Sequence, residues 1–143
     1  MKKKTILIAH EDDLLLRSCS TFFQTAGYQV EKAKCVSELI RKVRSDSCNV
    51  LLLDDETEGV KACDLVPVLK KVSGIIQVIV ISSEESLPTV RRLRGAGIFY
   101  QAMKPLDMEE LRAAVECAFE KIEREYPSWR GLFGLLIPGA ALA

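Results

Sequence analysis

The sequence predicts an α/β domain built on a doubly wound, five-stranded parallel sheet. Short runs rich in Leu, Ile and Val alternate with longer helix-like stretches between residue 4 and about residue 125. Apolar runs of this length are typical of parallel strands that are buried on both faces. The regular alternation, without repeats or a low-complexity linker, indicates one domain over residues 1–125, followed by an apolar tail at residues 126–143.

The first two strands and helices are predicted from short local signals. A strand at residues 5–10 leads into a helix at residues 14–26, whose apolar face has helical spacing. Gly27 is a natural left-handed stop for this helix. A short strand follows at residues 28–30, and Ser37 can cap the second helix.

The third strand, residues 50–53, is short and the most apolar, which predicts a central place in the sheet. A loop containing Gly59 follows at residues 54–63. Asp64 can cap the third helix. We expect Pro67 to be tolerated because it would fall in the first turn of that helix.

The last two strands are predicted at residues 75–81 and 98–103. Pro88 opens the helix between them. The fifth helix starts at Asp107, which forms an Asp-x-x-Glu capping box with Glu110.

The composition excludes several classes of function. Lys plus Arg and Asp plus Glu both number 20, so there is no overall attraction to nucleic acid or to an anionic membrane. Five cysteines without a CxxC spacing indicate a reducing compartment, and we expect a cytoplasmic protein. The single histidine, His10, excludes most transition-metal and histidine-dependent catalytic schemes.

Polar side chains follow four of the predicted strands, and the carboxyl ends of parallel strands form the ligand-binding edge of such a sheet. A paired carboxylate at a strand end is costly without a cation, and Mg²⁺ binds carboxylate oxygens. The alternative is that the acidic residues 11–13 form a solvated loop that caps the next helix. The residues at the four strand ends are Glu11 with Asp12, Asp54, Ser82 and Lys104.

Asp54 is the predicted phosphoacceptor. A carboxylate can attack phosphorus and form an aspartyl phosphate. Asp55 competes for this role, but strand alternation would point it away from the site. Lys104 supplies a positive charge for Asp54 or a phosphoryl oxygen. Ser82 supplies a hydroxyl, with Ser83 as its competitor.

On these motifs the chain resembles the receiver domain of two-component response regulators, which has a flavodoxin-like architecture. Residues 11–17 look like its opening acidic motif, and residues 50–54 with Gly59 look like its phosphoacceptor strand and loop. Residues 78–83 resemble the strand that ends in the switch hydroxyl. Residues 104–106 look like its Lys-Pro-hydrophobe signature, whose peptide bond is usually cis. The resemblance covers residues 4–125.

The resemblance implies a role for each site residue. Asp54 would be phosphoacceptor and metal ligand, Ser82 would hydrogen-bond the phosphoryl group, and Lys104 would pair with it. The implied cofactor is Mg²⁺, held by Glu11, Asp12 (most directly), Asp54 and the backbone carbonyl of Glu56.

Three positions depart from the family pattern. Glu58 stands where proline is usual, and Gln101 stands where an aromatic residue is usual. His10 stands where an aliphatic residue is common, and we expect it to have a structural or indirect role rather than to transfer phosphate.

The leading hypothesis is a phosphoacceptor signalling domain that receives phosphate from a sensor histidine kinase and switches an unknown protein partner. Beyond its own phosphotransfer and dephosphorylation we expect no enzyme activity. One alternative is a pseudo-receiver that acts as a phosphorylation-independent interaction module. Another is a Mg²⁺-dependent phosphatase, which lacks support because Glu56 stands where a general-acid aspartate would be needed.

The tail at residues 126–143 is apolar and has no acidic residue. It is too short for a membrane span, which needs about twenty apolar residues. We expect neither membrane insertion nor direct nucleic-acid binding, since no DNA-binding module is visible after residue 125. A homodimer formed through the tail is the favoured expectation.

Overall fold

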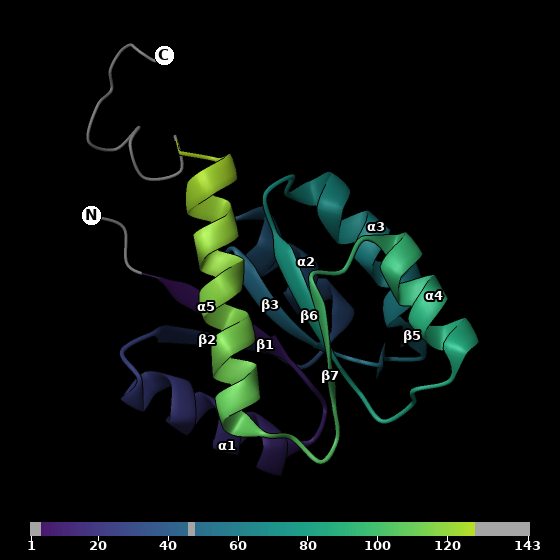
Figure 1. Cartoon of the computed structure of the whole chain (residues 1–143), viewed down its shortest axis with the longest axis horizontal. Coiled ribbons are helices and arrows are strands. Elements are labelled where there is room, and N and C mark those ends of the chain that lie inside the picture. Colours follow the sequence, from purple (N-terminus) through teal and green to yellow (C-terminus); the bar gives the residue numbers. More distant parts are fainter. Residues whose placement is uncertain (1–3, 46–47, 128–143) are drawn as a thin grey trace.

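The computed structural model describes residues 4–45 and 48–127. Its main sheet has five parallel strands in the order β2-β1-β3-β6-β7 (Figure 1). The strands of this sheet are β1 (Thr5–Ala9), β2 (Gln29–Ala33), β3 (Val50–Asp54), β6 (Gln77–Ser82) and β7 (Tyr100–Met103). The helices are α1 (Asp13–Thr25), α2 (Val36–Arg44), α3 (Ala62–Val72), α4 (Leu87–Ala96) and α5 (Met108–Glu125).

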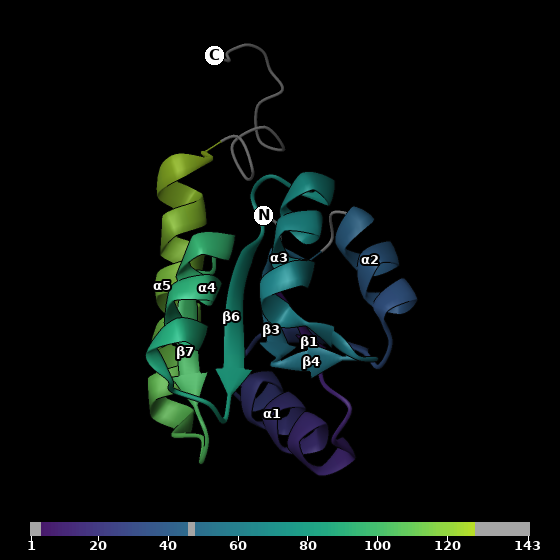
Figure 2. The ribbon, with the colours of Figure 1, turned by 90° about the vertical axis from the view of Figure 1, so that its right-hand side faces the viewer.

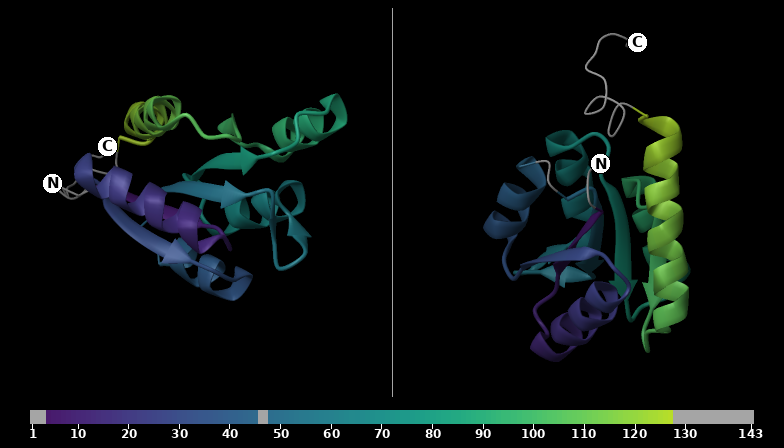
Figure 3. Two further views of the ribbon diagram at one scale, coloured as in Figure 1. Left: turned by 90° about the horizontal axis from the view of Figure 1, so that it is seen from below. Right: turned by 90° about the vertical axis from the view of Figure 1, so that its left-hand side faces the viewer.

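The doubly wound sheet predicted from the sequence is therefore confirmed, with β3 at its centre. Helices cover both faces of the sheet (Figure 2 and Figure 3). Helices α1 and α5 pack on one face, and α2, α3 and α4 pack on the other. Two buried clusters follow from this arrangement, because alternate residues of each strand point to opposite faces.

The alternation is clearest in β1 and β3. Ile6 and Leu52 pack with α1 and α5, whereas Leu7 and Leu51 pack with α2 and α3. All four side chains are fully buried. Because the sheet is covered on both faces, the polar residues at the strand ends are left at its carboxyl edge.

Four local expectations from the sequence are wrong. Ser37 does not cap α2, whose N-cap residue is Cys35 and has no side-chain cap bond. Asp64 lies inside the first turn of α3, which starts at Ala62, so Pro67 lies beyond the first turn. The predicted loop at residues 54–63 contains a small antiparallel hairpin of β4 (Glu56–Thr57) and β5 (Val60–Lys61).

The start of α5 has one of the two interactions expected of a capping box. The Asp107 carboxylate accepts hydrogen bonds from the backbone N–H groups of Glu109 and Glu110, as a helix cap does. The Glu110 side chain does not complete the box, and instead accepts a hydrogen bond from the Tyr100 hydroxyl. The Lys104–Pro105 peptide bond is cis, as the resemblance implied.

Among the described residues, no helix is both long and apolar enough to cross a membrane. The expected dimerisation tail falls almost entirely on residues 128–143, which lie outside the described part of the chain.

Candidate phosphoacceptor site

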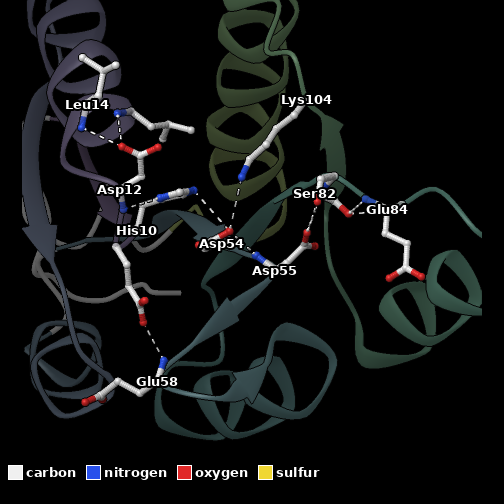
Figure 4. Close-up of polar contacts among 12 residues, drawn as sticks. His10, Asp12, Leu14, Asp54, Asp55, Glu58, Ser82, Glu84 and Lys104 are labelled. Carbon is white, nitrogen blue, oxygen red and sulfur yellow. Dashed lines mark hydrogen bonds and ion pairs between the residues drawn. The ribbon is translucent and has the colours of Figure 1, made fainter.

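The carboxyl ends of four strands bring their polar residues to one edge of the sheet (Figure 4). Ala9 pairs with Leu53 in the β1–β3 register, so the next residues, His10 and Asp54, lie side by side. Ser82 closes β6 and is level with Met103, which precedes Lys104. The structure therefore gathers His10, Asp54, Ser82 and Lys104 around one point.

Asp54 ends the central strand, and the contacts of its carboxylate with three neighbours are made through Oδ1. Oδ1 accepts a 2.8 Å hydrogen bond from the Asp55 N–H. It also lies 3.3 Å from His10 Nε2 and 3.9 Å from Lys104 Nζ. Within the described part of the chain, Oδ2 accepts no hydrogen bond.

The surroundings of Asp54 favour its ionised form. Burial raises the pKa of this carboxyl, but the polar contact with His10, the Asp55 N–H and the Lys104 ammonium together lower the pKa below its ordinary value. Asp54 is therefore a carboxylate at neutral pH, which is the form that can attack phosphorus.

His10 has a more direct place in the site than the sequence indicated. Its side chain is only 4% exposed. The imidazole Nδ1 accepts a 3.0 Å hydrogen bond from the Asp12 N–H, and Nε2 faces Asp54 (Figure 4). The 3.3 Å contact with Asp54 falls short of a normal hydrogen bond in its geometry, which leaves Nε2 buried without a good partner.

The structure does not bring Asp12 to Asp54. The Asp12 carboxylate caps α1 by accepting hydrogen bonds of 2.9 and 3.4 Å from the N–H groups of Leu14 and Leu15. In Figure 4 it points away from Asp54. This is the helix-capping alternative that the sequence left open for the acidic loop.

Glu11 is also held away from Asp54. Its Oε2 accepts a 2.8 Å hydrogen bond from the Glu58 N–H on the β4–β5 turn. Proline, which has no N–H, could not make this bond, so the departure at position 58 has a structural consequence. Glu58 has a φ of 51°, and its side chain accepts a 2.7 Å hydrogen bond from the Val36 N–H at the start of α2.

The expected magnesium ligands are therefore dispersed. Asp12 is occupied as a helix cap, and Glu11 is bonded to the hairpin. Across residues 4–45 and 48–127, no group of three or more His, Cys, Asp or Glu side chains is placed to hold a metal ion. In these positions the side chains do not fit the octahedral oxygen set that Mg²⁺ requires.

The competitors of Asp54 and Ser82 are bonded to each other. Asp55 Oδ2 accepts hydrogen bonds of 2.9 and 3.5 Å from the N–H and hydroxyl groups of Ser83. Ser82 is fully buried, and its hydroxyl donates to the Glu84 carbonyl at 2.9 Å. Asp55 is thus held by Ser83, whereas the ion pair of Lys104 is with Asp54.

Comparison with known proteins agrees with this architecture. The family model of the response regulator receiver domain matches residues 6–116. The DNA-binding transcriptional regulator NtrC of Azospirillum brasilense is 28% identical over 118 residues, which are 82% of this chain and 24% of that protein. This chain therefore spans only about a quarter of that relative's length.

Two further similarities cover nearly all of the matched protein. Sporulation initiation phosphotransferase F of Bacillus subtilis is 23% identical over 116 residues, covering 81% of this chain and 94% of that one. A CheY-like receiver domain protein from Methanospirillum hungatei superposes with a TM-score of 0.80 and 24% identity, covering 86% and 98% of the two chains. This second likeness concerns the fold alone.

Proposed function

Because the chain belongs to the family of response regulator receiver domains, we propose that it accepts a phosphoryl group on Asp54 from a histidine kinase and then switches a protein partner. Receiver domains are signalling domains of two-component systems. The observation that carries this proposal is the asymmetric environment of the Asp54 carboxylate, in which Oδ1 accepts a hydrogen bond and faces His10 and Lys104, and Oδ2 accepts no hydrogen bond within the described residues.

This asymmetry suits nucleophilic attack. Oδ2 would attack the phosphorus of a phosphohistidine, so that the new P–O bond forms as the P–N bond breaks. The leaving imidazole nitrogen keeps the electron pair of the broken bond. Oδ1 stays fixed by the Asp55 N–H, which holds the carboxylate in position for the transfer.

Positive charge is available where the phosphoryl group would lie. The Lys104 ammonium is 3.9 Å from Asp54 and is partly exposed, so it can move onto a phosphoryl oxygen. Ser82 can supply a hydroxyl donor once it leaves the Glu84 carbonyl. Transfer in such a site depends on positioning and charge neutralisation.

Dependence on Mg²⁺, with Glu11, Asp12, Asp54 and the Glu56 carbonyl as ligands, stays a prediction from the sequence. It would require Asp12 to give up the cap of α1 and Glu11 to leave the Glu58 N–H. We therefore derive no step of the transfer through a metal ion.

The partners are also proposals. A sensor histidine kinase would supply the phosphoryl group, and the partner that is switched is a protein of unknown identity. The zero net charge gives no reason to expect direct nucleic-acid binding. A cytoplasmic location would suit a domain that meets a kinase there.

The test uses phosphoramidate, whose P–N bond mimics that of a phosphohistidine and which leaves ammonia. The full chain, Asp54→Asn and the matched control Asp55→Asn are treated with and without Mg²⁺ and analysed by intact mass. We expect the phosphoryl mass on the wild type and Asp55→Asn but not on Asp54→Asn. Absence of that mass from the wild type under every condition would leave the pseudo-receiver as the function.

A further inference from the structure

His10 carries a buried N–H group that faces the phosphoacceptor. Its Nδ1 accepts a hydrogen bond from the Asp12 N–H, and an accepting ring nitrogen bears no proton. The proton of the neutral imidazole is therefore on Nε2. That atom is buried, has no hydrogen bond of normal geometry within the described part of the chain, and lies 3.3 Å from Asp54 Oδ1.

A buried donor without a good partner costs free energy, so this one needs a physical explanation. Phosphorylation of Asp54 would bring three more oxygens to the end of β3, beside Nε2. A phosphoryl oxygen could then accept the hydrogen bond that Nε2–H lacks in the unmodified protein. The fixed tautomer means that this donor is already oriented before the phosphoryl group arrives.

The position of His10 also explains why the carboxylates of Glu11 and Asp12 do not lie beside Asp54. A carboxylate at the end of β1 would repel Asp54 unless a cation lay between them. An imidazole N–H needs no cation beside Asp54. Asp12 and Glu11 are then available to cap α1 and to bind the hairpin, as observed.

On the basis of the proposed function, we propose that His10 is a phosphoryl-binding residue whose Nε2–H donates to the phosphoryl group on Asp54, so that phosphorylation does not require a divalent cation. With Lys104 on the other side, His10 gives the phosphoryl group a second donor. The covalent step is unchanged, because the P–O bond to Asp54 forms as the donor's P–N bond breaks.

The decisive experiment measures the rate of phosphorylation by phosphoramidate with Mg²⁺ and with a chelator. For the wild type we expect rates within about twofold of each other. In chelator, His10→Ala should be slower by about tenfold or more, since a hydrogen bond to a charged group is lost. His10→Gln keeps a donor at a similar reach and should recover most of the rate. His10→Asp should need Mg²⁺ and should bind it in calorimetry.

A second readout does not depend on any variant. His10 is the only histidine in the sequence, so its imidazole signals in NMR are unambiguous in a chain without a histidine tag. We expect the Nε2-bound proton to move downfield and to exchange more slowly with water when Asp54 is phosphorylated in chelator.

The outcomes separate this inference from the proposed function. If the wild type is phosphorylated with Mg²⁺ but is at least about tenfold slower in chelator, His10 does not replace the cation, and the proposed function stands. An unchanged Nε2 proton, or a His10→Ala rate equal to the wild type in chelator, overturns the role of His10 as a donor. If the wild type is never phosphorylated, the proposed function and this inference both fail.

Discussion

Gln101 and Ser82 donate hydrogen bonds to the same acceptor, the carbonyl oxygen of Glu84, at 3.1 and 2.9 Å. Gln101 is on β7 and Ser82 ends β6, so this carbonyl links the candidate phosphoacceptor site to the neighbouring strand. If the Ser82 hydroxyl turns toward a phosphoryl group, the carbonyl keeps Gln101 as its donor. Because Gln101 stands where an aromatic residue is usual in the family, coupling through the neighbouring Tyr100 is the alternative. The hydrogen bonds favour Gln101 instead, because the Tyr100 hydroxyl is bonded to Glu110 on α5.

We therefore expect Gln101→Ala to reduce the spread of structural change from Asp54 to α4. The variant should also lose about 0.5–1.5 kcal/mol of stability, the net value of one hydrogen bond. Amide chemical shifts of Leu87–Ala96, recorded before and after phosphorylation, measure the spread. The matched control is Tyr100→Phe, which removes a hydroxyl from the same strand without touching the Glu84 carbonyl. If the control, rather than Gln101→Ala, abolishes the shifts, Tyr100 is the relay.

Asp12 gives a second prediction, since two substitutions separate its helix-capping role from a metal-binding role. Asn is as good a cap as Asp but has no charge, whereas Ala has no capping atom. Asp12→Asn should keep the stability and the phosphorylation rate of the wild type, and Asp12→Ala should lose about 1 kcal/mol of unfolding free energy. Urea unfolding and intact-mass kinetics measure the two effects. A marked slowing of phosphorylation in Asp12→Asn would restore the metal-ligand role that the sequence predicted.

Glu58 gives a third prediction. Its backbone has a φ of 51°, which glycine adopts without the penalty of about 1–2 kcal/mol that other residues incur. Glu58→Gly keeps the N–H that binds Glu11 and relieves this strain, but it loses the bond to Val36 at the start of α2. These effects oppose each other, so we expect stability within about 0.5 kcal/mol of the wild type.

The stability of Glu58→Pro is compared with that of Glu58→Gly. Proline cannot adopt this φ and has no N–H, so we expect a loss of at least about 2 kcal/mol in urea unfolding. Equal stability of the two variants would show that neither the backbone conformation nor the bond to Glu11 matters for the fold.

Tyr100 gives a prediction for alkaline pH. The hydrogen bond to Glu110, then burial and the Glu110 charge, raise the pKa of the Tyr100 hydroxyl above its ordinary value. Its contribution to stability is therefore complete below the unfolded pKa of about 10 and is lost as the pH rises through the higher folded pKa. Glu110→Gln should lower the pKa of Tyr100 in an absorbance titration of tyrosinate, with Tyr100→Phe identifying its signal. Identical titrations of the wild type and Glu110→Gln would contradict this.

The sequence was sufficient to predict the sheet and the position of three candidate residues at its carboxyl edge. Asp54, Ser82 and Lys104 each follow an apolar run, and the ends of parallel strands must meet at one edge. The prediction of the fold depended only on these apolar runs and on the alternation of strands with helices. The capping role of Asp107 could also be predicted, because a cap residue binds N–H groups of the helix that directly follows it in the sequence.

The place of His10 depended on information that the sequence does not contain. The β1–β3 register pairs Ala9 with Leu53, which makes His10 rather than Glu11 the neighbour of Asp54. A shift of one residue along a strand changes which side chain faces the site. Helix α1 likewise starts one residue earlier than predicted, and this makes Asp12 its cap. The bonds of Glu58 to Glu11 and Val36 join segments far apart in the chain, so no local pattern could predict them.

The final prediction concerns association through the tail at residues 126–143. The outward face of α5, which leads into the tail, is charged, with Arg112, Glu116 and Glu120 exposed. Such a face offers little apolar surface to the tail, whereas the tail of a second copy offers a matching apolar surface in a symmetric dimer.

We expect the intact chain to sediment as a dimer at micromolar concentrations and a version ending at Glu125 to sediment as a monomer. Leu132→Asp with Leu136→Asp is the matched control, because it keeps the length of the tail but adds charge to it. This variant should also be a monomer, since burying unpaired carboxylates in an interface is unfavourable. Far-UV circular dichroism should show the same helix and strand signal in all three proteins, so that a change in mass reflects association rather than folding. If the intact chain and the shortened version are both monomers, the tail does not mediate dimerisation.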